Sequence, residues 1–226
     1  MKKGKLIVVE GIDGSGKETQ ANLLIDYLKS NKISTSLFDF PQYHKTFFGD
    51  FIGRFLNGEF GNISNINPYL AAFPYAGDRW QAKELIEDSL KKNAITVCNR
   101  YTPSVAYQMA KLTNDGKQHF LNWTEKLEYG IFKIPKEDLV IFLNVPYKFA
   151  FKLIEGKAKR NYLKGKLKDQ YEENVSYLKE VEKIYGWLNK RKNNWVKIDC
   201  LEKGKILNRQ QIHLKIVASL KKRAFI

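Results

Sequence analysis

KLIVVEGIDGSGKETQ, residues 5–20, joins a short apolar run to a glycine-rich turn, a lysine and the start of a helical pattern. Glycine adopts backbone angles that other residues resist, so successive N–H groups of such a turn can point inward at a phosphate. The following helix adds its positive N-terminal end, and Lys17 supplies a cation for a transferring phosphate. A phosphate-binding loop explains these features together better than a turn without function. The loop residues expected to contact a nucleotide are Gly11, Asp13, Gly14, Ser15, Gly16, Lys17, Glu18 and Thr19.

Short apolar runs alternate with helical patterns along the rest of the chain. The predicted strands are 5–10, 34–40, 94–99, 139–145 and 195–200, and the predicted helices are 19–30, 83–92, 104–112, 149–155 and 210–222. This alternation predicts an α/β fold with a five-stranded parallel sheet flanked by helices. In such a fold, ligands bind at the carboxyl ends of the strands, where the loop at residues 11–18 also falls. The length of 226 residues suits one domain, 1–226.

Composition excludes several classes of protein. No apolar run approaches the roughly 20 residues that span a membrane, and the first apolar run is too short for a signal peptide. We therefore expect a cytoplasmic protein. Cys98 and Cys200 are the only cysteines, too few for a disulfide framework or a metal cluster, and are expected to be buried thiols. The net charge of +15 could attract nucleic acid, but the lysines are spread along the chain, which argues against a dedicated nucleic-acid-binding protein.

The residue after Lys17 departs from the usual loop pattern, which places Ser or Thr there to meet Mg²⁺. Here Glu18 takes that position and the hydroxyl comes one residue later, on Thr19. The Lys-x-Thr-Gln pattern of residues 17–20 resembles adenylate-type nucleoside-monophosphate kinases, which also lack that hydroxyl. Mg²⁺ would then be held mainly by nucleotide phosphates and waters, with Asp13 nearby.

Beyond the loop, the sequence resembles the thymidylate kinase family over most of its length. Five segments carry the resemblance in the family's order: EGIDGSGKETQ (10–20), FPQY (40–43), YAGDRW (75–80), NRYTPSVAYQ (99–108) and DQYEENVSYLKEVEKIY (169–185). The resemblance implies a P-loop NTPase fold with a mobile lid at about 152–168 and a homodimer. It also implies phosphoryl transfer from ATP, with Mg²⁺, to dTMP.

The resemblance also implies roles for residues that would hold the acceptor's base and its 3′-hydroxyl region. Asp13 would meet that hydroxyl region and the metal environment, although it could simply shape the loop. Phe40 and Pro41 would wall the base pocket, although Phe40 could equally be a core residue. Tyr75 and Arg79 lie four residues apart and share a face if helical, so one would stack on thymine and the other would donate to it. Stacking on an aromatic side chain contributes ~1–3 kcal/mol per base, so Tyr75 could hold a pyrimidine. The alternative role for Arg79 is a surface salt bridge.

The segment after the third predicted strand would bind the acceptor phosphate and sugar. Arg100 would clamp the phosphate, a task that suits a guanidinium. Ser104 would either bind the acceptor or cap the next helix. Tyr107 would crowd the sugar 2′ position, and Gln108 would face the acceptor. The stretch from Arg100 to Tyr107 is one residue shorter than the common pattern.

Asn99 is a second departure, because the family usually has Asp before this arginine. Asparagine keeps the shape of that side chain but removes its charge. Since Glu18 adds a carboxylate nearby, we hypothesise that a carboxylate has moved rather than vanished.

The basic cluster at residues 152–168 occupies the position of the family's lid. Arg160 is its only arginine, so it would supply the catalytic cation, flanked by Lys157 and Lys159. The alternative is a solvated basic helix. Beyond the cluster, Tyr171 and then Glu172 would contact the acceptor.

Two other functions stay open at this level. One is a kinase for another pyrimidine monophosphate or for a deoxynucleoside. The other is a non-catalytic P-loop protein that binds nucleotide or nucleic acid, which Glu18, Asn99 and the net charge motivate. Lys17 and Arg100 oppose the second reading, because both suit phosphoryl transfer.

Overall fold

The computed structural model describes residues 4–62, 65–155 and 175–226. Its centre is a sheet of five strands, in the spatial order β2-β3-β1-β4-β5, and every neighbouring pair is parallel. The strands are β1 (Lys5–Glu10), β2 (Thr35–Asp39), β3 (Ile95–Asn99), β4 (Leu139–Asn144) and β5 (Trp195–Asp199). The predicted α/β class and five-stranded parallel sheet are therefore confirmed.

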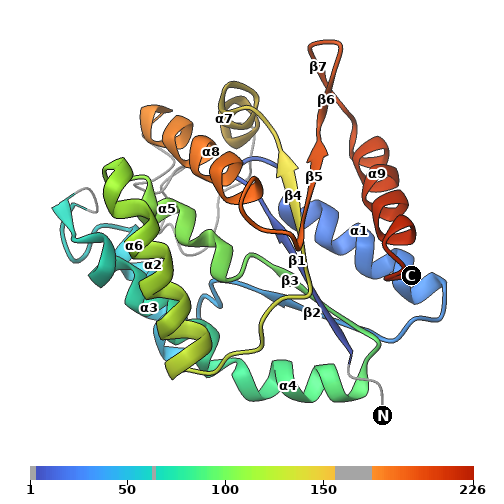
Figure 1. The fold of residues 1–226 in the computed structure, drawn as a ribbon, viewed down its shortest axis with the longest axis horizontal. Coiled ribbons are helices and arrows are strands. Elements are labelled where there is room, and N and C mark those ends of the chain that lie inside the picture. Colours follow the sequence, from blue (N-terminus) through green and yellow to red (C-terminus); the bar gives the residue numbers. More distant parts are fainter. Residues whose placement is uncertain (1–3, 63–64, 156–174) are drawn as a thin grey trace.

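Helices lie on both sides of this sheet (Figure 1). α1 (Lys17–Ser30) and α9 (Arg209–Lys222) pack together against one face, while α5 (Ala106–Met109) and α8 (Val175–Asn189) lie on the other. α4 (Lys83–Lys92) packs against β2 and β3, and α7 (Tyr147–Glu155) packs against α8. Because both faces are covered, β1 consists almost wholly of buried apolar residues, with Leu6 to Val9 at 0% exposure.

Several elements were not predicted. They are α2 (Phe47–Leu56), α3 (Pro68–Gln81), α6 (Asn114–Glu125), α8, the π-helical turn η3 (Lys126–Ile131) and a hairpin of β6 (Leu201–Glu202) and β7 (Lys205–Ile206). The predicted helix at 104–112 is also only partly correct. A 3₁₀ helix, η2 (Thr102–Val105), precedes the short α5 there, with Pro103 within its first two residues.

The parallel register brings three chain segments together at one edge of the sheet. Val9 lies beside Asn99, and Asn99 lies beside Asp39. The backbone N–H of Arg100 donates to the carbonyl of Val9, and that of Phe40 donates to the carbonyl of Asn99. The glycine loop, Arg100 and Phe40 therefore leave the sheet from adjacent positions, although up to 90 residues separate them along the chain.

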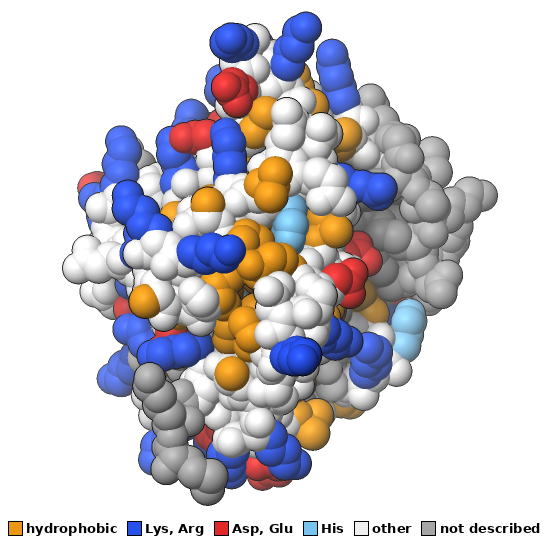
Figure 2. All heavy atoms as spheres, turned by 90° about the vertical axis from the view of Figure 1, so that its right-hand side faces the viewer, with side chains coloured by type: hydrophobic (Ala, Val, Ile, Leu, Met, Phe, Trp, Pro, Cys, Tyr) orange, Lys and Arg blue, Asp and Glu red, His pale blue; other side chains and the backbone are white. Residues whose placement is uncertain are grey.

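Both cysteines are buried free thiols, as expected. Burial raises the pKa of Cys200 to about 12 and raises that of Cys98 as well, so both stay protonated at neutral pH. Among the residues that the structure describes, no helix is both long and apolar enough to cross a membrane. On the face shown in Figure 2, Lys and Arg side chains are scattered rather than gathered into one basic patch.

Candidate functional site

A cavity of about 480 Å³ opens at the carboxyl edge of the sheet. Most of the residues predicted from the sequence line it: Asp13, Gly14, Gly16, Lys17, Glu18, Thr19, Phe40, Pro41, Tyr75, Arg79, Arg100, Ser104, Tyr107 and Gln108. Gly11 and Ser15 are buried in the loop and do not line the cavity. Arg160 and Tyr171 lie outside the described residues. The structure therefore brings together side chains that the sequence holds in four separate segments.

The glycine loop connects β1 to α1 as predicted. Gly14 and Gly16 have φ angles of 80° and 84°, which residues with a Cβ rarely adopt. A Cβ on Gly14 would also lie 2.2 Å from the carbonyl oxygen of Ala150 in α7, so the loop packs directly against that helix. Within the described ranges, no side chain makes a capping hydrogen bond at the N-terminus of α1, and the N-terminal end of a helix attracts anions. The Lys17 ammonium donates to the carbonyl of Ile12 (2.8 Å) and points into the loop.

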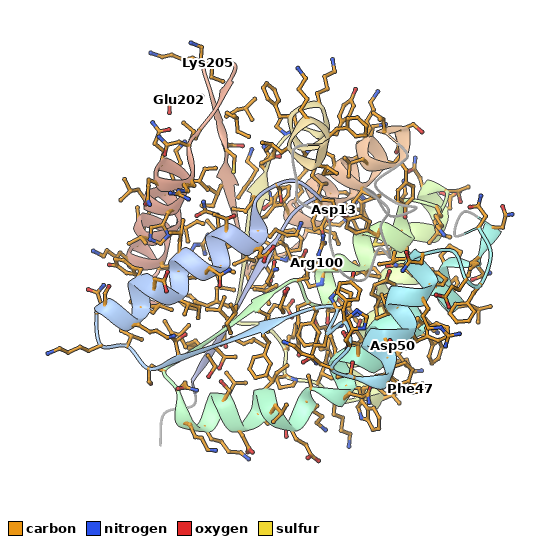
Figure 3. All side chains as sticks on the ribbon, turned by 180° about the vertical axis from the view of Figure 1, so that it is seen from behind. Asp13, Phe47, Asp50, Arg100, Glu202 and Lys205 are labelled. Atoms are coloured by element: carbon orange, nitrogen blue, oxygen red, sulfur yellow. The ribbon has the colours of Figure 1, made fainter. Side chains whose placement is uncertain are left out.

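Asp13 ties the loop to the two segments that follow β3. The Arg100 guanidinium donates to its Oδ1, and the Tyr107 hydroxyl donates to its Oδ2 at 2.6 Å. Figure 3 shows Asp13 and Arg100 approaching each other from the glycine loop and from the end of β3. Burial disfavours the charge of Arg100, but Asp13 and smaller contributions from Tyr107, Tyr185 and Glu10 together outweigh this effect, so the pKa of Arg100 lies well above its ordinary value. Arg100 is thus a fixed cation at the cavity wall, and Asp13 shapes the loop.

Asn99 lies next to a carboxylate that sequence reasoning overlooked. Its Nδ2 donates to Oδ1 of Asp39 at 2.7 Å, and Asp39 lines the same cavity. Burial, followed by a smaller repulsion from Glu18, raises the pKa of Asp39, while the hydrogen bond from Asn99 lowers it. We predicted that Glu18 supplies the carboxylate that is missing at position 99. Asp39 is a nearer candidate for that carboxylate, because it is hydrogen-bonded to Asn99. The signal that could have found it is the strand register, which places Asp39 beside Asn99.

The carboxylates of Asp13, Glu18 and Asp39 all line the cavity. Among the described residues, however, no group of three acidic, histidine or cysteine side chains is arranged to hold a metal ion alone. Asp13 is already engaged by Arg100 and Tyr107. This arrangement suits an Mg²⁺ ion that is held chiefly by nucleotide phosphates and waters, with one or two carboxylates nearby.

The other end of the cavity is aromatic and closed. Phe40 is buried at 3% exposure and packs against Tyr101, with ring centroids 5.8 Å apart, so it is both a core residue and part of the cavity wall. Tyr75 and Arg79 lie one turn apart on α3, as the spacing predicted. The alternative prediction of a surface salt bridge for Arg79 is wrong, because Arg79 is buried and its salt bridge is with the fully buried Glu128.

Ser104 does not cap a helix. It lies in η2, and its hydroxyl donates to Oε1 of Glu10 at 2.9 Å. Glu10 itself was overlooked by sequence reasoning, although it is a carboxylate with 0% exposure directly before the glycine loop. It also accepts hydrogen bonds from the N–H of Tyr101 (2.8 Å) and the hydroxyl of Tyr185 (2.7 Å). The charged residue that ends an apolar strand was the available signal.

The site thus combines a cradle for phosphates, fixed cations beside it and an aromatic pocket with a planar donor. The family model described as thymidylate kinase matches residues 9–212, most of the chain. The chain belongs to the thymidylate kinase family. Its members are nucleoside-monophosphate kinases, so the chain is an enzyme of that class, and the non-catalytic P-loop alternative is not favoured.

Curated relatives agree with this assignment. The chain is 37% identical to thymidylate kinase of Plasmodium falciparum over 150 residues, which cover 66% of this chain and 65% of that protein. It is 27% identical to thymidylate kinase of Mycobacterium tuberculosis H37Rv over 184 residues, 81% of this chain and 85% of that protein. The solved structure of a thymidylate kinase from Candida albicans has the same fold, with a TM-score of 0.75 and 22% identity over 99% of this chain and 93% of that chain.

The contact between Asn99 and Asp39 predicts the effect of restoring an aspartate. In Asn99→Asp, a carboxylate at the buried position 99 would face the carboxylate of Asp39 at hydrogen-bond distance and share a proton with it, which would raise their pKa values further. A folded-state pKa above the unfolded value destabilises the protein at higher pH, and this penalty is relieved as the pH falls through the raised pKa. We expect a thermal melting temperature at pH 8 at least several degrees below that of the native chain, with the difference shrinking toward pH 5. An Asn99→Asp protein with equal melting temperatures across this range would contradict the expectation, and Asn193→Asp, at an exposed side chain, is the matched control.

Proposed function

We propose that the chain transfers the γ-phosphoryl group of ATP to dTMP, producing dTDP and ADP. The observation that carries the proposal is one continuous cavity of about 480 Å³, whose lining includes the glycine loop and Arg100 as well as Phe40, Tyr75 and Arg79. A phosphate and a pyrimidine of one nucleotide can therefore be held at once. Bound Mg²⁺ would supply neutralising charge on the phosphates of ATP.

Phosphoryl transfer depends mainly on positioning and electrostatics, and different residues of the chain have different roles in it. The N–H groups of the loop and of the first turn of α1 hold the donor phosphates, and Lys17 lies among them to balance their charge. Arg100 clamps the acceptor phosphate. This phosphate competes with Asp13 for the guanidinium, so Asp13 becomes available to the acceptor's hydroxyl region or to the metal environment. Tyr75 stacks on the base and Arg79 donates to it, while Gln108, Ser104 and Pro41 complete the wall.

A coupled assay of ADP release with ATP and Mg²⁺ tests the proposal. We expect turnover with dTMP well above that with dUMP, UMP, CMP, AMP and GMP. Lys17→Met should lower kcat by about 100-fold or more, because the transferring phosphate loses a cation in a site that excludes water. Lys29→Met, an exposed lysine in the last turn of α1, is the control and should leave kcat unchanged. ATP binding without turnover of any monophosphate would refute the proposal.

We further propose that Arg160 supplies the cation that approaches the phosphates from the lid and that Tyr171 contacts the acceptor. Gly14 offers no cationic side chain in the loop, so the second cation is expected from elsewhere in the chain. Arg160→Ala should lower kcat by about 100-fold or more with little change in the KM for dTMP, since the contact is made chiefly in the transition state. Lys157→Ala and Lys159→Ala are the matched controls. A loss in Lys159→Ala as large as that in Arg160→Ala would move the role to the lysines.

We also propose that the protein is a homodimer and acts in the cytoplasm, a compartment that suits its two reduced thiols. α3 carries a stripe of exposed apolar side chains, Leu70 at 66%, Phe73 at 45% and Trp80 at 49% exposure, next to Phe47 of α2. A stripe of this kind marks an interaction surface. Trp80→Glu should convert the dimer to a monomer, as measured by light scattering after gel filtration. Leu214→Glu, an equally exposed leucine on α9, should not, and a native chain that elutes as a monomer would exclude the dimer.

A further inference from the structure

Glu128 is a carboxylate that the proposed reaction does not use. It lies on the π-helical turn η3, which follows α6 on the left of Figure 1, and its side chain has 0% exposure. Burying a carboxylate is costly unless it is paired and hydrogen-bonded, and π-helical turns are rare and occur often at functional sites. Glu128 nevertheless lines the cavity at its closed end, beside Arg79 and Thr124.

Three hydrogen bonds satisfy both oxygens of this carboxylate. Nε of Arg79 donates to Oε2 at 2.5 Å, and Nη2 of Arg79 donates to Oε1 at 2.8 Å. The hydroxyl of Thr102 donates to Oε2 at 3.0 Å. Burial alone would lower the pKa of Arg79, but the charge of Glu128 and its hydrogen bonds, with smaller contributions from Tyr101 and Asp78, together outweigh this effect and the pKa is raised. The bidentate pair therefore holds a charged, planar guanidinium in one orientation.

The pairing with Glu128 determines which N–H groups of the Arg79 guanidinium can bind a ligand in the cavity. Within the described part of the chain, Nη1 of Arg79 makes no hydrogen bond, and the residue lines the cavity. A guanidinium has donors and no acceptor. The carboxylate of Glu128 is turned toward Arg79 and Thr102, so what Arg79 adds to the cavity wall is N–H donors.

The chemistry of a pyrimidine nucleotide places one ring position against these donors. With its phosphate at Arg100, the acceptor nucleotide directs its base toward the closed end of the cavity. C4 lies across the ring from N1, which carries the sugar, so the group on C4 reaches deepest. In thymine and uracil that group is a carbonyl, which accepts hydrogen bonds. In cytosine it is an amino group, so its N–H donors would face the N–H donors of Arg79 and no hydrogen bond could form between them.

We propose that Glu128 is a specificity-determining positioning residue: by fixing the orientation of Arg79, it makes the pocket select 4-oxo pyrimidines over 4-amino pyrimidines. The inference rests on the proposed function and deepens it, because it assigns the choice between thymine and cytosine to a residue that acts through Arg79. Selection against cytosine is strong in such a pocket, since a mismatched pair of donors leaves buried polar groups unpaired.

The test is Glu128→Gln, which keeps the size of the side chain but replaces one acceptor with a donor that opposes an N–H of Arg79. We would measure kcat and KM for dTMP, dUMP and dCMP, together with the Kd of each by calorimetry. The ratio of kcat/KM for dTMP to that for dCMP should fall about tenfold or more, mainly through a higher KM for dTMP. The ratio of dTMP to dUMP should not change, because both bases carry the 4-oxo group, and the KM for ATP should not change.

Glu137→Gln is the matched control. Glu137 is also a buried carboxylate, at 9% exposure, and it accepts a hydrogen bond from the hydroxyl of Tyr129 at 2.7 Å, but it does not line this cavity. Its replacement should leave all three nucleotide ratios unchanged. Thr102→Val removes one hydrogen bond from Glu128 and should lower the ratio of dTMP to dCMP by a smaller factor, which keeps the test decisive if Glu128→Gln does not fold.

Two results would overturn the inference. One is a Glu128→Gln protein in which dTMP, dUMP and dCMP all weaken by the same factor, and the other is an equal loss of discrimination in Glu137→Gln. Should Glu128→Gln fail to fold, an unchanged ratio in Thr102→Val would also overturn it. A native chain that binds dTMP far more tightly than dCMP but does not phosphorylate it would refute the proposed function only, because the calorimetric ratio still measures the selection.

Discussion

The carboxylate of Glu10 is the constraint on which the site depends. It ends β1, is fully out of contact with solvent and directly precedes the glycine loop. A buried carboxylate without partners would cost several kcal/mol, so the N–H of Tyr101 and the hydroxyls of Ser104 and Tyr185 must reach it in the folded state. These donors come from the turn after β3, from η2 and from α8. One buried charge thus fixes three segments around the start of the loop.

The position of the main cation follows from that constraint. Arg100 directly precedes Tyr101, so the hydrogen bond from Tyr101 to Glu10 also holds Arg100 at the cavity wall. Asp13 then pairs with Arg100 and with Tyr107 on the other side of the loop. Because Asp13 and a phosphate are both anionic acceptors of the same guanidinium donors, the pair keeps the arginine oriented for an incoming nucleotide. Such preorganisation places charge in advance of the reaction.

The two ends of the cavity use charge in different ways. At the loop, Lys17 and Arg100 face a ligand that brings its own negative charge. At the closed end, the charge of Arg79 is already balanced by Glu128, so that end is suited to a neutral base and reads it by hydrogen bonds. Asp39 and Glu18 also line the cavity, and the hydrogen bond from Asn99 lowers the pKa of the Asp39 carboxylate. A charge balance of this kind orients a nucleotide in one direction along the cavity.

Much of the fold and of the phosphate end could be predicted from the sequence, because local spacing determines them. Apolar runs with helical patterns between them specify the parallel sheet, and the glycines with Lys17 specify the loop, since both depend on neighbours along the chain. Tertiary structure alone decided the pairings Arg79–Glu128, Asp39–Asn99 and Glu10–Tyr185, which join residues 49, 60 and 175 positions apart. Those contacts depend on the strand order β2-β3-β1 and on how α3, η3 and α8 pack around it, and no local pattern encodes that arrangement.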